Sequence, residues 1–274
     1  AGAGSGAGLR TVTLAHGSGG AAMKALIEEV FVAALGEGAR EDAATTRLAE
    51  LAAQGETLAV TSDSFVVTPL VFPGGDIGRL AVCGTVNDLA TAGAVPLQLS
   101  CSVILEEGLE IALLRDIARS MAAAAREAGV RIVTGDTKVV PHGACDRLFV
   151  RRGVAPSSAA CRPGDAVLVS GPLGDHGAAI LAARGDLALE TTIESDCAPL
   201  HGLVARLLDA VPATRFLRDA TRGGLATVLN EAAAASQVGI ELAETAIPVR
   251  DAVRGLCEIL GLDPLYLANE GRMV

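Results

Sequence analysis

The chain has 274 residues; half of them are hydrophobic, but the aromatic residues are only one Tyr and five Phe, with no Trp. This length favours two domains at about 150 residues each, and the apolar content supplies a core of Ala, Val, Leu and Ile and excludes intrinsic disorder. The 32 acidic residues outnumber the 22 basic ones and give a net charge of −10. Nucleic acid and anionic membranes are therefore unfavourable partners, and no apolar stretch reaches the roughly 20 residues of a membrane span.

The six cysteines are scattered without a CxxC pair, which argues against a zinc site and a disulfide framework and favours a reducing cytoplasm. The first residues, AGAGSGAG, contain neither a basic region nor an apolar block. They are typical of a flexible linker rather than a signal peptide. Residues 1–14 are accordingly predicted to be a flexible leader and a first strand.

The first half of the chain is predicted to alternate strands, helices and glycine-rich turns. The chain is predicted to begin with an extended segment to Leu14, the loop HGSGG (16–20) and a helix with apolar residues from Met23 to Phe31. A strand at 57–67 and a turn-dense connection at 71–79 follow, and a strand at 80–86 leads into a small-residue helix that ends near Gly93. The last predicted elements of this half are a strand at 102–107, a helix at 110–128 closed by Gly129, and a strand at 131–134 that is followed by the turn GDTK.

Near residue 156 the small polar stretch PSSAACRPGD interrupts this alternation and predicts a boundary between domains at 15–156 and 157–274. The second half is predicted to contain a strand at 166–171, helices at 174–184, 198–210 and 225–235, a strand around Phe216 and the turn RDATRGG. The elements alternate without the regularity of a dinucleotide-binding domain, which indicates an α+β or mixed α/β fold in both halves.

Four aspartates are each predicted to lie where a strand runs into a loop of small residues: Asp63, Asp88, Asp136 and Asp219. Side chains at loop ends can converge, and carboxylate oxygens suit Mg²⁺, which is shared with substrate phosphates. Taken singly, each aspartate is more typical of an N-cap or a turn. The hypothesis of a metal site rests on their repetition.

The loop of His16, Gly17, Ser18, Gly19 and Gly20 offers successive backbone N–H groups at the start of a helix, an arrangement that suits a phosphate. It matches neither the GxxxxGK[ST] nor the GxGxxG pattern. The alternative interpretation is a hinge with a capping Ser18, in which His16 is a surface or capping residue.

Lys138 and Glu270 are candidates for the chemical steps. Lys138 follows Asp136 by two residues, so on an extended segment both side chains point to the same side, and the ammonium lies beside the proposed metal and phosphates. Glu270 precedes Gly271, and such a carboxylate can act as a general base if its pKa is raised. An ordinary surface charge is the alternative for each.

The ordered motifs HGSGG, TSDSFVVTPL, VCGTVNDLATAGAVPL, IVTGDTKVV, PGDAVLVSG, LRDATRGGLATVLNE and NEGRMV closely resemble the ATP-dependent family that includes aminoimidazole ribonucleotide synthetase and selenophosphate synthetase. Within it, HGSGG and TKVV point to hydrogenase maturation factors of the HypE type. The resemblance runs from about Leu14 to the last residue. It implies two α+β domains in a homodimer, in which the N-terminal sheets of two subunits form a barrel.

The resemblance further implies an enzyme that uses ATP and Mg²⁺ to dehydrate a carbamoyl thioester on a C-terminal cysteine to a thiocyanate, the source of cyanide for nickel-iron hydrogenase. It makes Lys138 the residue that offsets phosphate charge and Glu270 the base. Nucleotide or metal contacts are expected from Asp63, Asn87, Asp88, Asp136, Thr137 and Asp219. The implied partners are the carbamoyltransferase HypF and the HypC–HypD complex.

One departure concerns the tail, because the family ends in a Pro-Arg-Ile-Cys-like sequence, whereas this sequence ends at Val274 and its last cysteine is Cys257. The sequence is therefore expected to be a fragment or to lack that tail. Two alternatives stay open. One is another enzyme of the superfamily, such as selenophosphate synthetase, against which the lack of a cysteine before Cys83 counts. The other is a non-catalytic ATP-binding scaffold for maturation partners.

Overall fold

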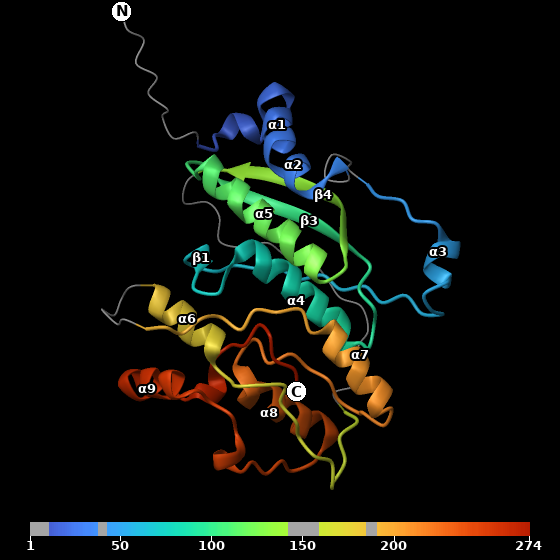
Figure 1. Ribbon diagram of the computed structural model, residues 1–274, viewed down its shortest axis with the longest axis vertical. Coiled ribbons are helices and arrows are strands. Elements are labelled where there is room, and N and C mark those ends of the chain that lie inside the picture. The colour runs from blue at the N-terminus through green and yellow to red at the C-terminus, as the bar shows by residue number, and fades with distance from the viewer. Residues whose placement is uncertain (1–10, 38–42, 142–158, 185–190) are drawn as a thin grey trace, which may run out of the picture. The chain divides into compact units, whose positions relative to one another are not determined.

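The computed structural model describes residues 11–37, 43–141, 159–184 and 191–274, and the chain divides into two compact units (Figure 1). Unit 1 comprises residues 1–56 and 97–148, and unit 2 comprises residues 57–96 and 149–274. Unit 2 thus combines a segment of the first half of the chain with the second half. The boundary predicted near residue 156 and residues 1–10 of the predicted leader lie outside the described residues.

Two parallel strands joined by a helix form the centre of unit 1. Strand β3 (Gln98–Glu106) pairs in parallel with β4 (Arg131–Val140), and α5 (Ile111–Glu127) connects them. Parallel strands require such a crossover connection. Gly129, just beyond α5, has a φ of +66°, which favours glycine at a helix end. The predictions of the first of these strands and of the helix are confirmed.

The first long helix of unit 1 is continuous but changes its winding. It consists of α1 (Gly20–Leu26), the π-helical stretch η2 (Ile27–Val32) and α2 (Ala33–Leu35), and it follows the 3-10 turn η1 (Leu14–His16). The helix predicted from the apolar spacing is therefore confirmed. It shares one apolar core with β3 and α5, formed by Val12, Leu26, Val30, Phe31, Leu105, Ile111, Leu114 and Ala118. A short helix, α3 (Leu48–Ala52), also belongs to this unit.

Strand β4 runs through the residues GDTK, which were predicted to form a turn. Asp136 lies opposite Ser102 and Lys138 opposite Ile104 in the ladder with β3. A Cβ at Gly135 would lie 2.5 Å from the carbonyl oxygen of Cys101. The turn prediction is wrong because this glycine allows two strands to approach closely rather than the chain to reverse.

Unit 2 is mainly helical. Its described elements are the hairpin of β1 (Val71–Phe72) and β2 (Gly75–Asp76), the helices α4 (Ile77–Thr91), α6 (Asp175–Ala183), α7 (His201–Ala210), α8 (Gly224–Ser236) and α9 (Asp251–Leu260), and the 3-10 turns η4 (Glu244–Ala246) and η5 (Pro264–Tyr266). The predictions of α6, α7 and α8 are confirmed, whereas α9 was not predicted. Nowhere in the described parts of the chain is a helix both long and apolar enough to cross a membrane.

Three predicted strands are not formed in unit 2. The segments 57–67 and 166–171 and the residues around 216 contain no paired strand in the structure. Leu58 and Val60, in the first of these segments, are exposed. These predictions are wrong because β-branched and apolar residues favour a strand only where a neighbouring strand supplies backbone hydrogen bonds and packing.

The apolar run 80–86, predicted as a strand, lies in the middle of α4. The carboxylate of Asp76 caps this helix, because Oδ1 accepts hydrogen bonds from the N–H groups of Gly78 at 2.7 Å and Arg79 at 3.0 Å. A short apolar run that is buried on most sides has the same pattern in a helix and in a strand. The strand prediction is therefore wrong, and Asp88 lies within a helix rather than at the end of a strand.

The Asp76→Ala variant is expected to lose about 1 kcal/mol of unfolding free energy in urea denaturation, because two N–H groups at the start of α4 lose their acceptor. The exposed Asp209 near the end of α7 supplies the matched control. Asp209→Ala is expected to change stability by less than about 0.5 kcal/mol. Equal losses in the two variants would show that the cap does not stabilise α4.

Candidate active site

A cluster of four acidic side chains lies in unit 2 and is called here the carboxylate cluster: Asp63, Asp88, Asp219 and Glu270. Burial, together with the negative charges of Asp219 and Asp63, raises the pKa of Asp88 to about 7. Burial also raises the pKa of Glu270 well above its usual value, and the charges of Asp219, Asp196 and Asp63 add to this effect. The structure thus brings together three of the four predicted metal ligands and the predicted base.

Backbone pairing between two distant segments brings Asp219 beside the segment that contains Glu270. Asp219 and Met273 form an isolated antiparallel pair. Next to it, the N–H of Arg218 donates to the carbonyl of Val274 at 2.9 Å, and the N–H of Val274 donates back at 2.7 Å. The convergence of the carboxylates therefore depends on main-chain hydrogen bonds, which do not depend on the identity of the side chains.

Gly271 allows the Glu270 segment to pass very close to another loop. A Cβ at position 271 would lie 1.8 Å from the carbonyl oxygen of Asp196 and 3.1 Å from the backbone nitrogen of Ala198. No side chain fits in this space. The glycine of the motif NEGR thus serves close backbone packing.

Asn87 precedes Asp88 in α4 but is almost completely buried, with 2% of its surface exposed. Its Nδ2 donates to the carbonyl groups of Ala198 at 3.0 Å and Glu270 at 3.2 Å, and its Oδ1 accepts from the N–H of Leu200 at 2.6 Å. The side chain therefore links α4 to two other segments of unit 2. Its predicted contact with a nucleotide stays a prediction.

Sequence reasoning missed three residues of this site. Thr61 donates from Oγ1 to Oδ2 of Asp88 at 3.2 Å. Asp196 accepts a hydrogen bond from the backbone N–H of Glu270 at 3.0 Å, and Nε of Arg272 lies 3.5 Å from its Oδ2. Thr61 and Arg272 lie inside the motifs TSDS and NEGR and could have been found from them. Asp196 lies in no motif, so the sequence does not mark it.

The carboxylate cluster offers the negative charge and oxygen donors that a hard divalent cation takes, but it does not form a complete metal site. The pKa values of Asp88 and Asp219 are both raised, chiefly by burial, and Arg218 is the cation that opposes the shift in each case. In the part of the chain that the structure describes, no three His, Cys, Asp or Glu side chains are gathered closely enough to hold a metal ion by themselves. Mg²⁺ suits such a site because it retains water and takes phosphate oxygens as ligands.

Asp136, the fourth predicted metal ligand, belongs to unit 1, where it pairs with Lys138. The two exposed side chains lie on one side of β4, with Nζ of Lys138 2.9 Å from Oδ1 of Asp136. This is the arrangement predicted for residues two apart on an extended segment. The intervening Thr137 is buried, and its N–H donates to Oδ1 of Asp136 at 2.9 Å. Asp136 therefore lies within a strand, and its predicted place at a strand end is wrong because the ladder with β3 continues past it.

The glycine loop 16–20 packs against the same strand of unit 1. A Cβ at Gly17 would lie 2.7 Å from Cβ of Val139 and 3.0 Å from the backbone nitrogen of that residue. Only a glycine allows this approach. The loop is thereby placed close to the residue that follows Lys138 on β4.

The two polar side chains of the loop stabilise the turn η1. Nδ1 of His16 accepts from the backbone N–H of Thr13 at 3.0 Å, and Oγ of Ser18 donates to the carbonyl of Leu14 at 2.9 Å. The capping alternative foreseen for these two residues thus describes their contacts. The exposed Gly19 and Gly20 follow with φ values of +79° and +78°.

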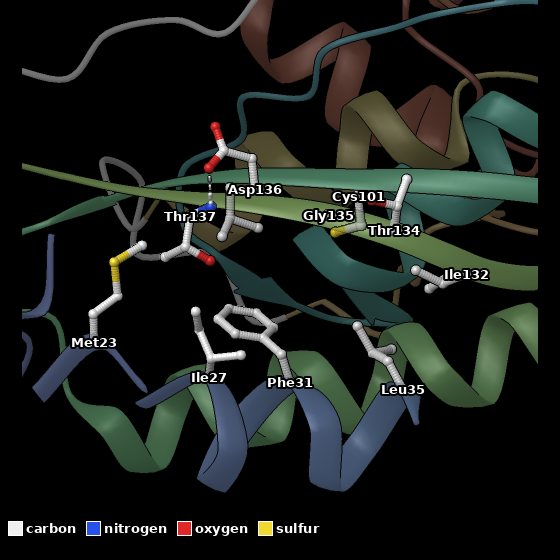
Figure 2. A pocket seen from close by; sticks show the side chains of 11 residues that line it. Met23, Ile27, Phe31, Leu35, Cys101, Ile132, Thr134, Gly135, Asp136 and Thr137 are labelled. Atoms are coloured by element: carbon white, nitrogen blue, oxygen red, sulfur yellow. Dashed lines mark hydrogen bonds between the residues drawn. The ribbon is translucent and has the colours of Figure 1, made fainter. Parts of the chain in front are cut away.

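A cavity of about 70 Å³ lies between the first helix and the β3–β4 pair of unit 1. Figure 2 shows the side chains that line it. Apolar side chains such as Met23, Ile27 and Phe31 line one side, and Asp136 and Thr137 lie opposite, joined by their hydrogen bond. Sites for drug-sized ligands and cofactors have volumes of about 300 Å³ or more. This cavity is therefore too small to hold a nucleotide.

Comparison with known proteins identifies the family. Residues 40–154 match the family model for the N-terminal domain of AIR synthase related proteins, and residues 162–274 match that for the C-terminal domain. The carbamoyl dehydratase HypE of Rhodobacter capsulatus is 60% identical over 271 residues, which cover 96% of this chain and 80% of that protein. The chain belongs to the HypE family of carbamoyl dehydratases. The resemblance inferred from the motifs is confirmed.

Two solved HypE structures extend this result. A HypE crystal structure in complex with ATP is 50% identical and has a TM-score of 0.85, covering 95% of this chain and 79% of that one. The structure of a HypE–HypF complex matches with 49% identity and a TM-score of 0.71, covering 77% of this chain and 72% of that one. The expected two AIR synthase-like domains of the α+β class are thus confirmed.

This HypE-family chain is expected to lose stability as the pH rises from about 4 to about 7 in the absence of ATP and Mg²⁺. With a raised pKa, Asp88 holds a proton in the folded state that it releases in the unfolded state, so the unfolding free energy falls across this range. The Asp88→Asn variant is expected to show a smaller fall in urea unfolding measured across the same range. An unchanged pH dependence in this variant would show that Asp88 does not have a raised pKa in the folded state.

Proposed function

We propose that the chain catalyses the ATP-dependent dehydration of a carbamoyl group, bound as a thioester to a cysteine, to a thiocyanate that supplies the cyanide ligand of nickel-iron hydrogenase. The observation that carries this proposal is the 60% identity to a carbamoyl dehydratase over nearly the whole chain. The buried Glu270, which has a raised pKa, supports it because the reaction needs a base near neutral pH.

The reaction divides into a transfer and an elimination. The carbamoyl oxygen attacks the γ-phosphorus of ATP and forms a C–O–P linkage, and ADP leaves. In this step the carbamoyl nitrogen releases one of its two protons and forms a C=N double bond. A base then removes the remaining proton from the carbamoyl nitrogen, the C–O bond breaks with release of phosphate, and a carbon–nitrogen triple bond forms. The balance is one ATP and one carbamoyl thioester converted to ADP, phosphate and thiocyanate.

Each step has candidate residues in this chain. Glu270 takes the proton from nitrogen, and Lys138 offsets negative charge on the transferred phosphoryl group. The loop of His16, Gly17, Ser18, Gly19 and Gly20 offers N–H groups to phosphate, while Asp136 and Thr137 contribute to nucleotide binding. Asp63, Asp88 and Asp219 would hold Mg²⁺, with Asp136 as a further predicted ligand. Bound Mg²⁺ neutralises phosphate charge.

The assembly of the protein is part of the same proposal. The chain is proposed to form a homodimer in which two N-terminal sheets make a barrel, with domains at 15–156 and 157–274. The carbamoyltransferase HypF is the proposed donor of the carbamoyl group, supported by the HypE–HypF complex of a relative. The HypC–HypD complex is the proposed acceptor of cyanide, and the cytoplasm is the proposed location.

The proposal is tested with a peptide that ends in S-carbamoyl cysteine, incubated with the protein, ATP and Mg²⁺. Mass spectrometry is expected to show loss of one water from the peptide, with one ATP consumed per thiocyanate formed. Glu270→Gln is expected to reduce this rate by about 10²- to 10⁴-fold. Glu258→Gln, at an exposed position in α9, is the matched control and should retain the parental rate. ATP hydrolysis without any thiocyanate from the parental protein would reject the proposed reaction.

Binding and turnover of ATP are expected to separate in two other variants. Asp88→Ala should lose Mg²⁺-dependent ATP binding in titration calorimetry, because a carboxylate of the cluster is removed. Lys138→Ala should still bind ATP but lose turnover by about 10²-fold or more, because charge on the phosphoryl group is no longer offset. If both variants bind and hydrolyse ATP like the parental protein, Asp88 and Lys138 do not have the proposed roles in the ATP site.

A further inference from the structure

The peptide units on both sides of Glu270 are held by side chains from other segments. The N–H of Glu270 donates to Oδ1 of Asp196 at 3.0 Å, and its carbonyl accepts from Nδ2 of Asn87 at 3.2 Å. The two side chains come from a loop before α7 and from α4. Both polar backbone groups of this one residue are thus fixed by side chains far away in the sequence.

Asn87 is rigidly placed for this contact. Both of its amide hydrogens are committed, since Nδ2 also donates to Ala198, and Oδ1 accepts the short bond from Leu200. A primary amide has only these two donors. With 2% of its surface exposed, the side chain has no free donor for a nucleotide and instead links α4 to the loop that contains Asp196.

Asp196 is held by burial and by an ion pair. Its side chain is completely buried, and Nε of Arg272 lies 3.5 Å from its Oδ2 while donating to the carbonyl of Pro172 at 2.7 Å. The backbone of Asp196 also lies against Gly271, where no side chain fits. Glu270 is therefore held between two side chains that cannot readily move.

We propose that Asn87 and Asp196 are positioning residues that clamp the backbone of Glu270 and so aim its carboxylate at the proton to be removed. This inference rests on the proposed function, in which Glu270 is the base. A displacement of about 1 Å of a catalytic group costs roughly 10²-fold in rate, which explains why a residue in an irregular segment is fixed on both sides. Asn87 then acts through Glu270 rather than as a ligand of the nucleotide.

The first test separates kcat from KM in the Asn87→Ala variant, with the S-carbamoyl cysteine peptide as substrate. The clamp predicts a fall in kcat of about tenfold or more, with KM for ATP within about twofold of the parental value. A raised KM for ATP with an unchanged kcat would make Asn87 a nucleotide ligand and overturn the inference.

A double-mutant cycle with Glu270→Gln tests whether Asn87 acts through Glu270. Asn87→Ala is expected to cause no further loss of the residual rate of Glu270→Gln, followed over long incubations. The same fold loss in both backgrounds would overturn the clamp. A parental rate in Glu270→Gln would instead reject the base assignment itself, so the two failures are distinguishable.

A second pair of variants keeps the test valid if Asn87→Ala does not fold. Asp196→Ala removes the acceptor of the Glu270 N–H, whereas Asp196→Asn keeps an acceptor oxygen and is expected to retain more of the parental kcat. Equal losses in these two variants would contradict the clamp. Thr85→Ala in α4 is the control, because its Oγ1 donates only to the carbonyl of Ala81 within the helix, at 2.8 Å, and its kcat should be parental.

Discussion

The antiparallel pairing of residues 218–220 with 272–274 is the interaction on which the candidate site depends. Three backbone hydrogen bonds, of 2.7 to 3.1 Å, join these segments. Met273 anchors the pairing, because it packs in one apolar cluster with Ala90 of α4 and Leu217. Burial of this side chain adds to the stabilisation that the backbone hydrogen bonds give to the pairing. Asp219, Glu270 and α4 with Asp88 are consequently brought to one place.

Gathering carboxylates in a partly desolvated place opposes folding, because each charge disfavours ionisation of its neighbours. This cost raises the pKa values of Asp88, Asp219 and Glu270. A ligand that brings positive charge to the folded state relieves it and stabilises the protein. The same electrostatic feature that weakens the free protein therefore favours a cation and raises the affinity of the Glu270 carboxylate for a proton.

Unit 1 presents its candidate residues by a different physical means. The regular alternation of β4 places Asp136 and Lys138 on one side of the strand, and the ladder with β3 holds both in place. Two glycines then allow close approaches of backbone. Gly135 admits the neighbouring strand, and Gly17 brings the glycine loop against Val139. Here rigidity comes from a sheet, whereas in unit 2 it comes from side chains that hold irregular segments.

The sequence by itself determined the features that depend on neighbours along the chain. The periodic apolar residues of α5, its end before Gly129, and the shared side of Asp136 and Lys138 follow from local geometry alone. The ordered motifs also sufficed to indicate the family, since they contain most of the residues near the site. Asp196 is the exception, because nothing along the chain marks it.

Only the tertiary structure decided which apolar runs became strands and which residues surround Glu270. The segment 80–86 is a helix and 57–67 is unpaired, because a strand needs a partner whose position no local pattern specifies. Likewise, Asn87 fits a ligand-binding motif in sequence but is buried in structure, where its amide bonds to segments more than a hundred residues away. The physical reason is that hydrogen bonds and burial between distant segments depend on how the whole chain packs.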